Sequence, residues 1–202
     1  MLKRLTEAEA IEALRQGGVV VFPTETRYCL GCRAADPEAV ARLQSAKQRP
    51  DGKPLPVLLP NVRSLERFEP ETPLLGLADA FWPGPLTLIV PAFPGLASAV
   101  TADTNMVGVR VSGHPVAVRL AAGLGEPLVA TSANRSGEAP TSTAAACDAA
   151  GLEGVSGIVD GGEVSGVRST VVGFVEGDLR IFQEGPISAE RVRAEWARLR
   201  GD

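Results

Sequence analysis

Short apolar runs that favour β-strands alternate along this chain with segments of helical periodicity, and this alternation limits the possible folds most strongly. The predicted strands lie at residues 19–22, 55–59, 86–90, 107–111, 127–131, 158–160 and 179–182, with one more within residues 166–174. The predicted helices lie at residues 6–16, 37–47, 73–82, 115–123, 140–150 and 188–200. Because some strands follow one another without a helix between them, the pattern predicts an α/β fold with a mixed β-sheet.

The length and composition are those of an ordinary globular protein. The chain has 202 residues, of which 45% are hydrophobic and 22% are charged. No repeat, linker or low-complexity segment interrupts it, so we expect a single domain over residues 1–202. Capping signals mark the starts of several predicted helices, namely Thr6 with Glu9, Asp36 before Pro37, and Ser188.

The charge balance and the hydropathy pattern argue against two classes of protein. The formal net charge is −4, whereas a nucleic-acid-binding protein usually carries a surplus of Lys and Arg. No apolar stretch approaches the roughly 20 residues that a membrane-spanning helix needs. The first residues form an amphipathic helical pattern, unlike a signal peptide. We therefore expect a cytoplasmic protein that does not act at a membrane.

The predicted strand at residues 19–22 is followed at Pro23 by a loop rich in polar groups. This loop carries Thr24, Glu25, Thr26, Arg27 and Tyr28. A buried strand that delivers polar groups is a common way to build a small-molecule site. An ordinary strand ending in a turn is the alternative interpretation, since Pro and Thr are frequent in turns.

The three cysteines, Cys29, Cys32 and Cys147, lack the pattern of a metal or redox site. Cys29 and Cys32 form a C-x-x-C, but a structural zinc site needs four ligands, and only Cys147 and His114 remain, at irregular spacing. A redox C-x-x-C usually opens a helix, whereas this one lies in or beside a strand. We therefore interpret Cys29 and Cys32 as small buried residues.

Two loops and one strand carry groups that suit an anion. Lys47, Arg49 and Lys53 lie close together on a loop that contains two prolines and a glycine. Residues 131–137 (TSANRSG) combine small polar side chains with a glycine, which lets backbone N–H groups approach a phosphate. Arg110 lies inside an apolar strand and either points to solvent or lines a cleft. A solvated basic loop and ordinary turn chemistry are the alternatives. The Rossmann and P-loop motifs are absent, so a nucleotide would bind by another route.

Seven segments, taken together, resemble the YrdC family of threonylcarbamoyl-AMP synthases. They are GGVVVFPTETRYCLGC, the K-x-R of residues 47–49, KPL at residues 53–55, FWPGPLTLIV, VGVRVSGHP, TSANRSG and RSTVV. Each segment is weak alone, but all seven occur in the family order and cover about residues 10–187. We expect the short, single-domain form of the family, in which residues 188–200 form a C-terminal helix.

The resemblance implies a YrdC-like twisted open sheet with a concave basic cleft. It also implies a nucleotidyltransferase that makes L-threonylcarbamoyladenylate from L-threonine, bicarbonate and ATP and releases pyrophosphate. The product would pass to the transferase machinery that forms N6-threonylcarbamoyladenosine at position 37 of tRNA. Mg²⁺ would be held mainly by the ATP phosphates and water, as this cation prefers.

The resemblance also implies roles for individual residues. The residues implied for L-threonine binding are Thr26, Arg110, Ala130 and Ser169. The residues implied for ATP binding are Lys47, Arg49, Lys53, Ser132, Asn134 and Thr141. Such a reaction depends on positioning and charge stabilisation, here by Lys47, Arg49 and Arg110, more than on a nucleophilic side chain. No protein ligand for a metal is evident, and Glu25 is only a weak candidate.

Four positions depart from the family pattern. Arg27 and Cys29 stand where the family has Val and Gly, Leu58 stands where many relatives have His, and Gln183 stands where an arginine would contact phosphate. Arg27 in the cleft would add an anion contact, whereas a buried Arg27 would need a partner. Arg27 or Arg168 could compensate for Gln183.

These departures leave two other functions open. The first is an RNA-binding module, with weak RNA binding and no adenylation activity. The second is a related carbamoyl-adenylate enzyme with another amine acceptor, because Cys29 would narrow the pocket.

Overall fold

The computed structural model describes residues 1–50, 52–70 and 72–201 of the chain. Its α-helices are α1 (Glu7–Arg15), α2 (Pro37–Lys47), α3 (Thr72–Phe81), α4 (Ser98–Thr101), α5 (Pro115–Leu124), α6 (Ala144–Ala149) and α7 (Ala189–Arg200). Its strands are β1 (Val20–Pro23), β2 (Tyr28–Gly31), β3 (Val57–Leu58), β4 (Leu86–Pro91), β5 (Met106–Arg110), β6 (Leu128–Val129), β7 (Thr131–Ser132), β8 (Gly157–Ile158), β9 (Thr170–Val175) and β10 (Asp178–Gln183). A 3-10 helix, η1 (Val62–Phe68), follows β3.

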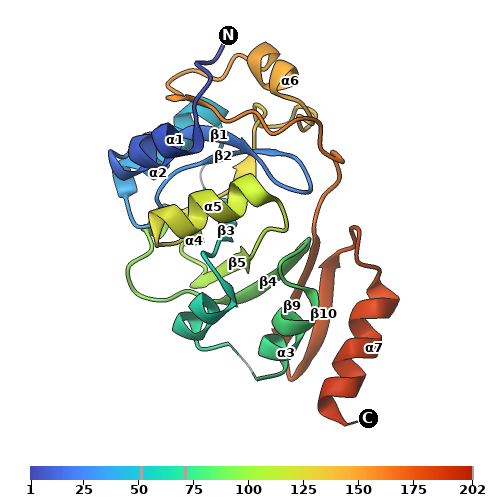
Figure 1. Cartoon of the computed structure of the whole chain (residues 1–202). Coiled ribbons are helices and arrows are strands. Elements are labelled where there is room, and N and C mark those ends of the chain that lie inside the picture. The colour runs from blue at the N-terminus through green and yellow to red at the C-terminus, as the bar shows by residue number, and fades with distance from the viewer. Residues whose placement is uncertain (51, 71, 202) are drawn as a thin grey trace.

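The strands form two hydrogen-bonded sheets, in the orders β7-β2-β1-β8 and β10-β9-β4-β5-β3-β6. Both sheets are mixed, because β1 pairs with β8, β3 with β5 and β4 with β9 in parallel, and the other pairs are antiparallel. In Figure 1 the first sheet lies on the side of the N-terminus, α1 and α6, and β9 and β10 lie beside α3 and α7. The prediction of a mixed α/β fold flanked by helices is confirmed.

One extended segment pairs with both sheets and joins them. In this segment β6 runs antiparallel to β3 of the larger sheet, and β7 runs antiparallel to β2 of the smaller one. Between them, the amide of Ala130 donates to the carbonyl of Pro56 at 2.9 Å. The sequence predicts one uninterrupted strand at residues 127–131, and the structure corrects this because the segment changes partner at Ala130. We call residues 128–132 the seam.

The apolar run that precedes the polar loop is buried on both of its faces. Val19 and Val21 belong to the larger hydrophobic core, whereas Val20 and Phe22 belong to a second cluster that is completed by side chains of α1 and α5. Alternating strand residues point to opposite faces, so two separate cores require apolar residues at every position. This double burial explains why the run is continuous in the sequence.

The predicted helix starts at Thr6 and Asp36 are confirmed. The Thr6 hydroxyl accepts from the amide of Glu9 at 3.2 Å, and the Glu9 carboxylate accepts from the amide of Thr6 at 2.8 Å, which completes a capping box. The Asp36 carboxylate accepts from the amide of Ala39 at 3.0 Å. Ser188 likewise accepts from the amide of Arg191.

Three predicted elements have boundaries that differ from the structure by one to four residues. The helix predicted at residues 140–150 begins only at Ala144, because the backbone carbonyl of Thr141 accepts from the amide of Tyr28 at 3.0 Å and holds the preceding residues extended. The strand predicted at residues 55–59 is limited to β3, because Pro56 and Pro60, on either side of it, lack the N–H donor that a ladder hydrogen bond needs. The strand predicted at residues 158–160 is β8, which ends at Ile158.

Pairs of helices pack together on the outside of the sheets. Helix α1 packs against α5, and α3 packs against α7. On α7, the Trp196 ring lies 5.7 Å from the Phe174 ring of β9, centroid to centroid, which fixes the helix to the larger sheet. Within the described ranges, no helix has both the length and the apolar character needed to cross a membrane.

Candidate functional site

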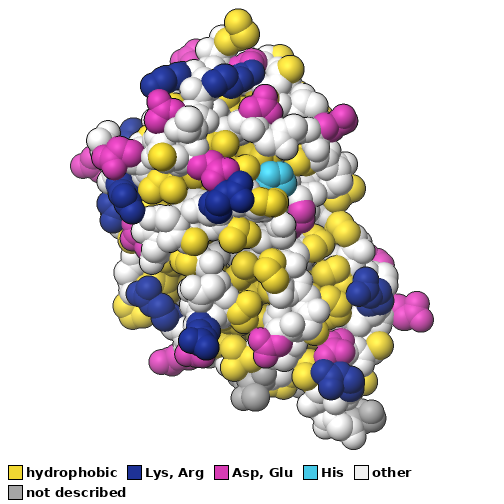
Figure 2. Space-filling model, viewed as in Figure 1, with side chains coloured by type: hydrophobic (Ala, Val, Ile, Leu, Met, Phe, Trp, Pro, Cys, Tyr) yellow, Lys and Arg dark blue, Asp and Glu magenta, His cyan; other side chains and the backbone are white. Residues whose placement is uncertain are grey.

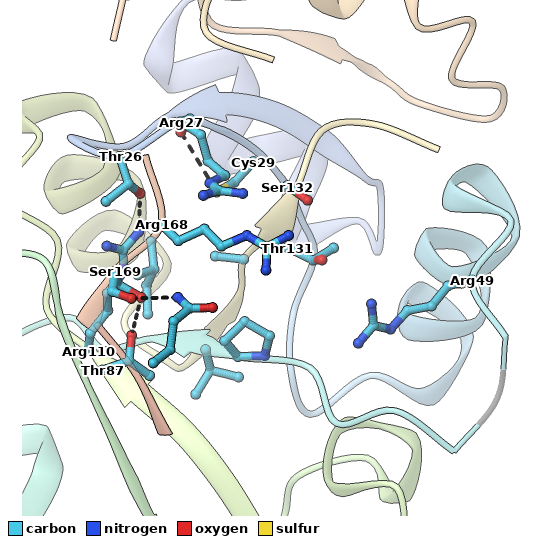
Figure 3. A pocket seen from close by; sticks show the side chains of 15 residues that line it. Thr26, Arg27, Cys29, Arg49, Thr87, Arg110, Thr131, Ser132, Arg168 and Ser169 are labelled. Atoms are coloured by element: carbon cyan, nitrogen blue, oxygen red, sulfur yellow. Dashed lines mark hydrogen bonds between the residues drawn. The ribbon is translucent and has the colours of Figure 1, made fainter. Parts of the chain in front are cut away.

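A cavity of about 370 Å³ lies where the seam brings the two sheets together. The turn between β1 and β2 forms one wall, and the two residues just before β9 together with the last residue of β10 form another. Its lining residues are Thr26, Arg27, Cys29, Arg49, Pro56, Val57, Leu58, Thr87, Arg110, Ala130, Thr131, Ser132, Arg168, Ser169 and Gln183. Figure 3 shows these side chains converging on one space from both sheets.

Among the residues that the structure describes, four arginines line this cavity and no acidic residue does. They are Arg27, Arg49, Arg110 and Arg168. On the outer face in Figure 2, Lys and Arg side chains are interspersed with Asp and Glu side chains. The cavity therefore concentrates positive charge in a chain whose net charge is −4. A guanidinium group suits phosphate and carboxylate because its planar N–H donors can bind two oxygens at once.

Arg110 is the most deeply placed of the four arginines, and it forms an ion pair with Glu25. The distance from Nη1 of Arg110 to Oε1 of Glu25 is 2.7 Å, and 9% of the arginine side chain is exposed. Its Nη2 donates to the Thr26 hydroxyl at 3.1 Å. The Glu25 carboxylate also accepts from the Ser112 hydroxyl and from the amide of Gly113. Glu25, the weak candidate for a metal ligand, is thus occupied by protein donors.

The turn that carries Thr26 is held by hydrogen bonds within itself. The amide of Thr24 donates to the carbonyl of Arg27 at 2.9 Å, and the amide of Arg27 donates to the Thr24 hydroxyl at 3.2 Å. The hydroxyls of Thr24 and Thr26 lie 2.8 Å apart, and both residues are almost fully buried. This local network fixes the Thr26 hydroxyl against Arg110.

The wall on the side of β9 and β10 presents hydroxyl and amide groups. The Ser169 hydroxyl lies 2.9 Å from the hydroxyl of Thr87 on β4. The Gln183 amide donates to the carbonyl of Ser169 at 2.7 Å, so it supplies a dipole and no charge. Arg168, whose neighbour Ser169 shares this wall, is exposed and lines the same cavity.

Lys47 is buried at the end of α2 and lies outside the lining of the cavity. Its ammonium donates to the carbonyl of Ser132 at 2.5 Å and to the carbonyl of Asn134 at 2.9 Å. Its Nζ also lies 3.2 Å from the side-chain oxygens of both residues. Burial lowers the pKa of Lys47 to about 8. Lys47 thus holds the loop that carries Ser132 into the cavity wall.

The structure brings together six of the ten predicted site residues. Thr26, Arg49, Arg110, Ala130, Ser132 and Ser169 line the cavity. Lys47, Lys53, Asn134 and Thr141 do not line it: Lys53 is exposed, and Thr141 is buried with its hydroxyl on the carbonyl of Ala133.

Sequence reasoning missed Thr87 and Thr131 as cavity residues. Thr87 left a usable signal, because it is a polar residue inside the apolar strand LTLIV. Thr131 left no such signal, because hydroxyl residues are ordinary at the ends of strands.

The interpretation of Cys29 and Cys32 as buried residues is confirmed. Cys29, Cys32 and Cys147 are free and buried, and burial raises the pKa of Cys32 to about 12 and of Cys147 to about 11. Cys29 also lines the cavity beside Thr26, with 3% of its surface exposed. In the part of the chain that the structure describes, no three His, Cys, Asp or Glu residues are grouped to hold a metal ion.

The fold and the cavity together define a class: a mixed α/β protein with a cavity between two sheets, whose arginine and hydroxyl groups suit a small anionic ligand. The model of the family that comprises Sua5, YciO and YrdC, described as "Telomere recombination", matches residues 12–185. The chain belongs to the Sua5/YciO/YrdC family.

Three relatives give the scale of the similarity. The threonylcarbamoyl-AMP synthase of Bacillus subtilis (strain 168) is 40% identical over 192 residues, which cover 93% of this chain and 55% of that protein. The threonylcarbamoyl-AMP synthase of Xanthomonas euvesicatoria pv. vesicatoria (strain 85-10) is 40% identical over 158 residues, 75% of this chain and 83% of that protein. The crystal structure of P. abyssi Sua5 complexed with L-threonine has a TM-score of 0.88 and 34% identity, and the match covers 96% of this chain and 58% of that one. The chain thus spans little more than half of the Bacillus and Pyrococcus proteins.

Proposed function

We propose that this protein is an L-threonylcarbamoyladenylate synthase, which uses L-threonine, bicarbonate and ATP and releases pyrophosphate. The observation that carries the proposal is the cavity in which four arginines and several hydroxyls converge, with no carboxylate among the described residues of its lining. Relatives named threonylcarbamoyl-AMP synthase, and a Sua5 structure with L-threonine, support the choice of substrates.

The chemistry of this reaction matches a site without a nucleophilic side chain. The threonine amine combines with bicarbonate to give a carbamate and water, and a carbamate oxygen then attacks the α-phosphorus of ATP. The bond from the α-phosphorus to the bridging oxygen breaks, and pyrophosphate leaves. The protein must position the reactants, neutralise the phosphates and keep water from the unstable carbamate.

We propose that two groups of residues divide this work. Thr26, Arg110, Ala130 and Ser169 bind L-threonine, and Arg110 orients a carboxylate. Lys47, Arg49, Lys53, Ser132, Asn134 and Thr141 serve ATP. Within the second group Arg49 and Ser132 line the cavity, while Lys47 acts through the loop that it holds.

Mg²⁺ fits this site only as a companion of the ATP phosphates. The described part of the cavity lining supplies no carboxylate, and Glu25 is engaged with Arg110. When it is bound, the ion would neutralise phosphate charge and use phosphate oxygens and water as ligands.

The proposed product would serve the tRNA threonylcarbamoyl transferase machinery, which modifies position 37 of tRNA. A mixed anhydride of this kind reacts with water, so rapid transfer to that machinery in the cytoplasm is the role that we propose for it.

The direct test is pyrophosphate release by the purified protein with ATP, Mg²⁺, bicarbonate and L-threonine. We expect release that depends on both threonine and bicarbonate, and a product whose mass is that of threonylcarbamoyl-AMP. Omission of each substrate in turn is the control. If micromolar enzyme releases no pyrophosphate above the threonine-free reaction, the proposed function is wrong.

The alternative that the cavity itself favours is a related carbamoyl-adenylate enzyme with an amine acceptor other than L-threonine. Cys29 lies in the wall beside Thr26 and takes space at the threonine side. A panel of amino acids in the same assay separates the two: a higher kcat/KM for glycine, alanine or serine than for threonine would favour the alternative.

A further inference from the structure

Arg27 carries a charge that no carboxylate of the described residues balances. Its side chain lies in the cavity wall, and Nε and Nη2 both donate to the carbonyl of Val167, at 3.1 and 2.6 Å. Among the described residues, no Asp or Glu forms an ion pair with it. A carbonyl dipole satisfies N–H donors but does not neutralise a guanidinium, so the burial of this charge has a cost that an anionic ligand would offset.

The donors of Arg27 are only partly used. A guanidinium has five N–H groups, and the bonds to Val167 use one on Nε and one on Nη2. The remaining groups, including both on Nη1, are free to bind an oxyanion in the cavity while the contact with Val167 persists.

The position of Arg27 also suits a ligand that extends beyond the first cavity. A second cavity, of about 830 Å³, shares Thr26, Arg27 and Arg168 with the first. Figure 3 shows Arg27 and Arg168 beside each other on the cavity side of the turn. Two cations at the junction of two cavities form a place for a phosphate, and because Glu25 and Glu184 also line the second cavity, the phosphate itself belongs on the side of the first.

We propose that Arg27 is a phosphate-binding residue of this site, and that it acts together with Arg168. The proposal rests on the proposed function for the nature of the anion, a phosphate group of the nucleotide or of released pyrophosphate. Arg27 would thus supply, from the turn between β1 and β2, the positive charge that Gln183 does not supply from β10.

A purely structural role is the competing explanation. Arg27 could serve only to hold residues 161–168 against the turn through Val167. Other bonds already do so: the Ser165 hydroxyl donates to the carbonyl of Glu25 at 2.9 Å, the amide of Val164 donates to Ser142 at 3.0 Å, and the Tyr28 hydroxyl donates to Gly162 at 2.8 Å. Removal of the Arg27 charge should therefore leave this segment in place.

The test is calorimetric titration of the full chain with inorganic pyrophosphate. Arg27→Gln removes the charge and leaves a shorter polar side chain with one NH₂ group as donor, and we expect the Kd to rise about tenfold, as for the loss of one charged contact. Arg193→Gln, at an exposed position of α7, makes the same change in net charge and should leave the Kd unchanged. Gln183→Arg in the Arg27→Gln background returns a cation to the same cavity and should recover most of the affinity.

Two results would overturn the proposal. The first is an Arg27→Gln protein that binds pyrophosphate as tightly as Arg193→Gln. The second is a loss of affinity that Gln183→Arg does not recover, together with faster hydrogen exchange at the amide of Val164. That combination would show that Arg27 only holds residues 161–168 in place. The titration measures binding and does not depend on catalysis. If the protein had no synthase activity, the proposed function would be wrong, but the titration would still show whether Arg27 binds phosphate.

Discussion

At the scale of single residues, the site depends on how each arginine is paired. Arg110 shares Glu25 with two other donors, whereas the partners of Arg49 among the described residues are backbone carbonyls, at 2.9 Å from Pro54 and 3.4 Å from Lys53. An ion pair holds an arginine in position, but the carboxylate offsets part of its positive electrostatic potential. An arginine that donates to backbone carbonyls keeps its full charge to attract a ligand. These two residues should therefore respond differently to substitution.

Arg49→Ala should reduce kcat/KM for threonine-dependent pyrophosphate release by at least about 100-fold, as is typical when a charge-stabilising donor is lost. The free energy of unfolding should change by less than about 1 kcal/mol, because the carbonyl contacts are partly exposed. Initial rates and urea denaturation measure the two quantities, with Arg193→Ala as the matched control. Full activity in Arg49→Ala would show that the phosphates lie elsewhere.

In contrast to Arg49→Ala, Glu25→Gln should lower the free energy of unfolding. The substitution leaves Arg110 buried without its counter-charge, with 9% of its side chain exposed, and we expect a loss of about 2–3 kcal/mol in the free energy of unfolding. Glu38→Gln is the control, because Glu38 is 86% exposed in its ion pair with Arg42. An equal denaturation midpoint for both variants would mean that the pair with Arg110 contributes nothing to stability.

At the scale of elements, the loop after β7 is built on the end of α2. The Lys47 ammonium bonds the carbonyls of Ser132 and Asn134, and its own carbonyl accepts from the amide of Ser136 at 2.9 Å. A helix terminus and a loop that are distant in the sequence thus form one unit, which sets the position of the Ser132 hydroxyl.

Lys47→Met keeps the length of the side chain but leaves the acceptors of this loop without a donor. We expect the free energy of unfolding to fall by about 1–3 kcal/mol, and the amides of residues 132–136 to exchange faster with solvent. Lys3→Met, at an exposed lysine, is the control. If the loop exchanges equally in both variants, the ammonium does not hold it.

Elements were predictable from the sequence where their cause is local. The capping box at Thr6 and the double burial around β1 leave patterns within a few residues. The change of partner at Ala130 left none, because the segment contains no proline or glycine after Pro127 and the break depends on the distant Pro56 carbonyl. The pairing of Glu25 with Arg110 joins positions 85 residues apart, so no spacing could reveal it.

At the scale of the whole molecule, one hydrophobic core runs from the first strand to the last helix. Its members include Val19 at one end of the chain and Trp196 at the other. We propose on this basis that residues 1–202 form one domain, which should unfold in a single cooperative transition.

This transition should weaken at alkaline pH because of the buried thiols. Burial raises the pKa of Cys32 to about 12 and of Cys147 to about 11, whereas an unfolded thiol titrates near 9. Between these values the unfolded state has lost a proton that the folded state keeps, so the free energy of unfolding falls as the pH rises from 9 toward 11.

Each such thiol contributes a slope of at most about 1.4 kcal/mol per pH unit. Urea denaturation at pH 8, 9, 10 and 11 measures it, and Cys32→Ala should flatten the curve, although burial of Tyr28, which raises its pKa to about 12, adds a further decline above pH 10. An identical pH dependence in Cys32→Ala and the unaltered protein would contradict this prediction.

The seam determines how a bound ligand would affect the relative motion of the two sheets. Thr26 lies in the turn between β1 and β2 of one sheet, and Ser169 lies just before β9 of the other, while residues 128–132 join the two sheets along one edge of the space between them. A ligand that bonds to both Thr26 and Ser169 would connect the two sheets at a second place, across the cavity from the seam. Bound substrate would therefore restrict the relative motion of the two sheets, and release of the product would restore it.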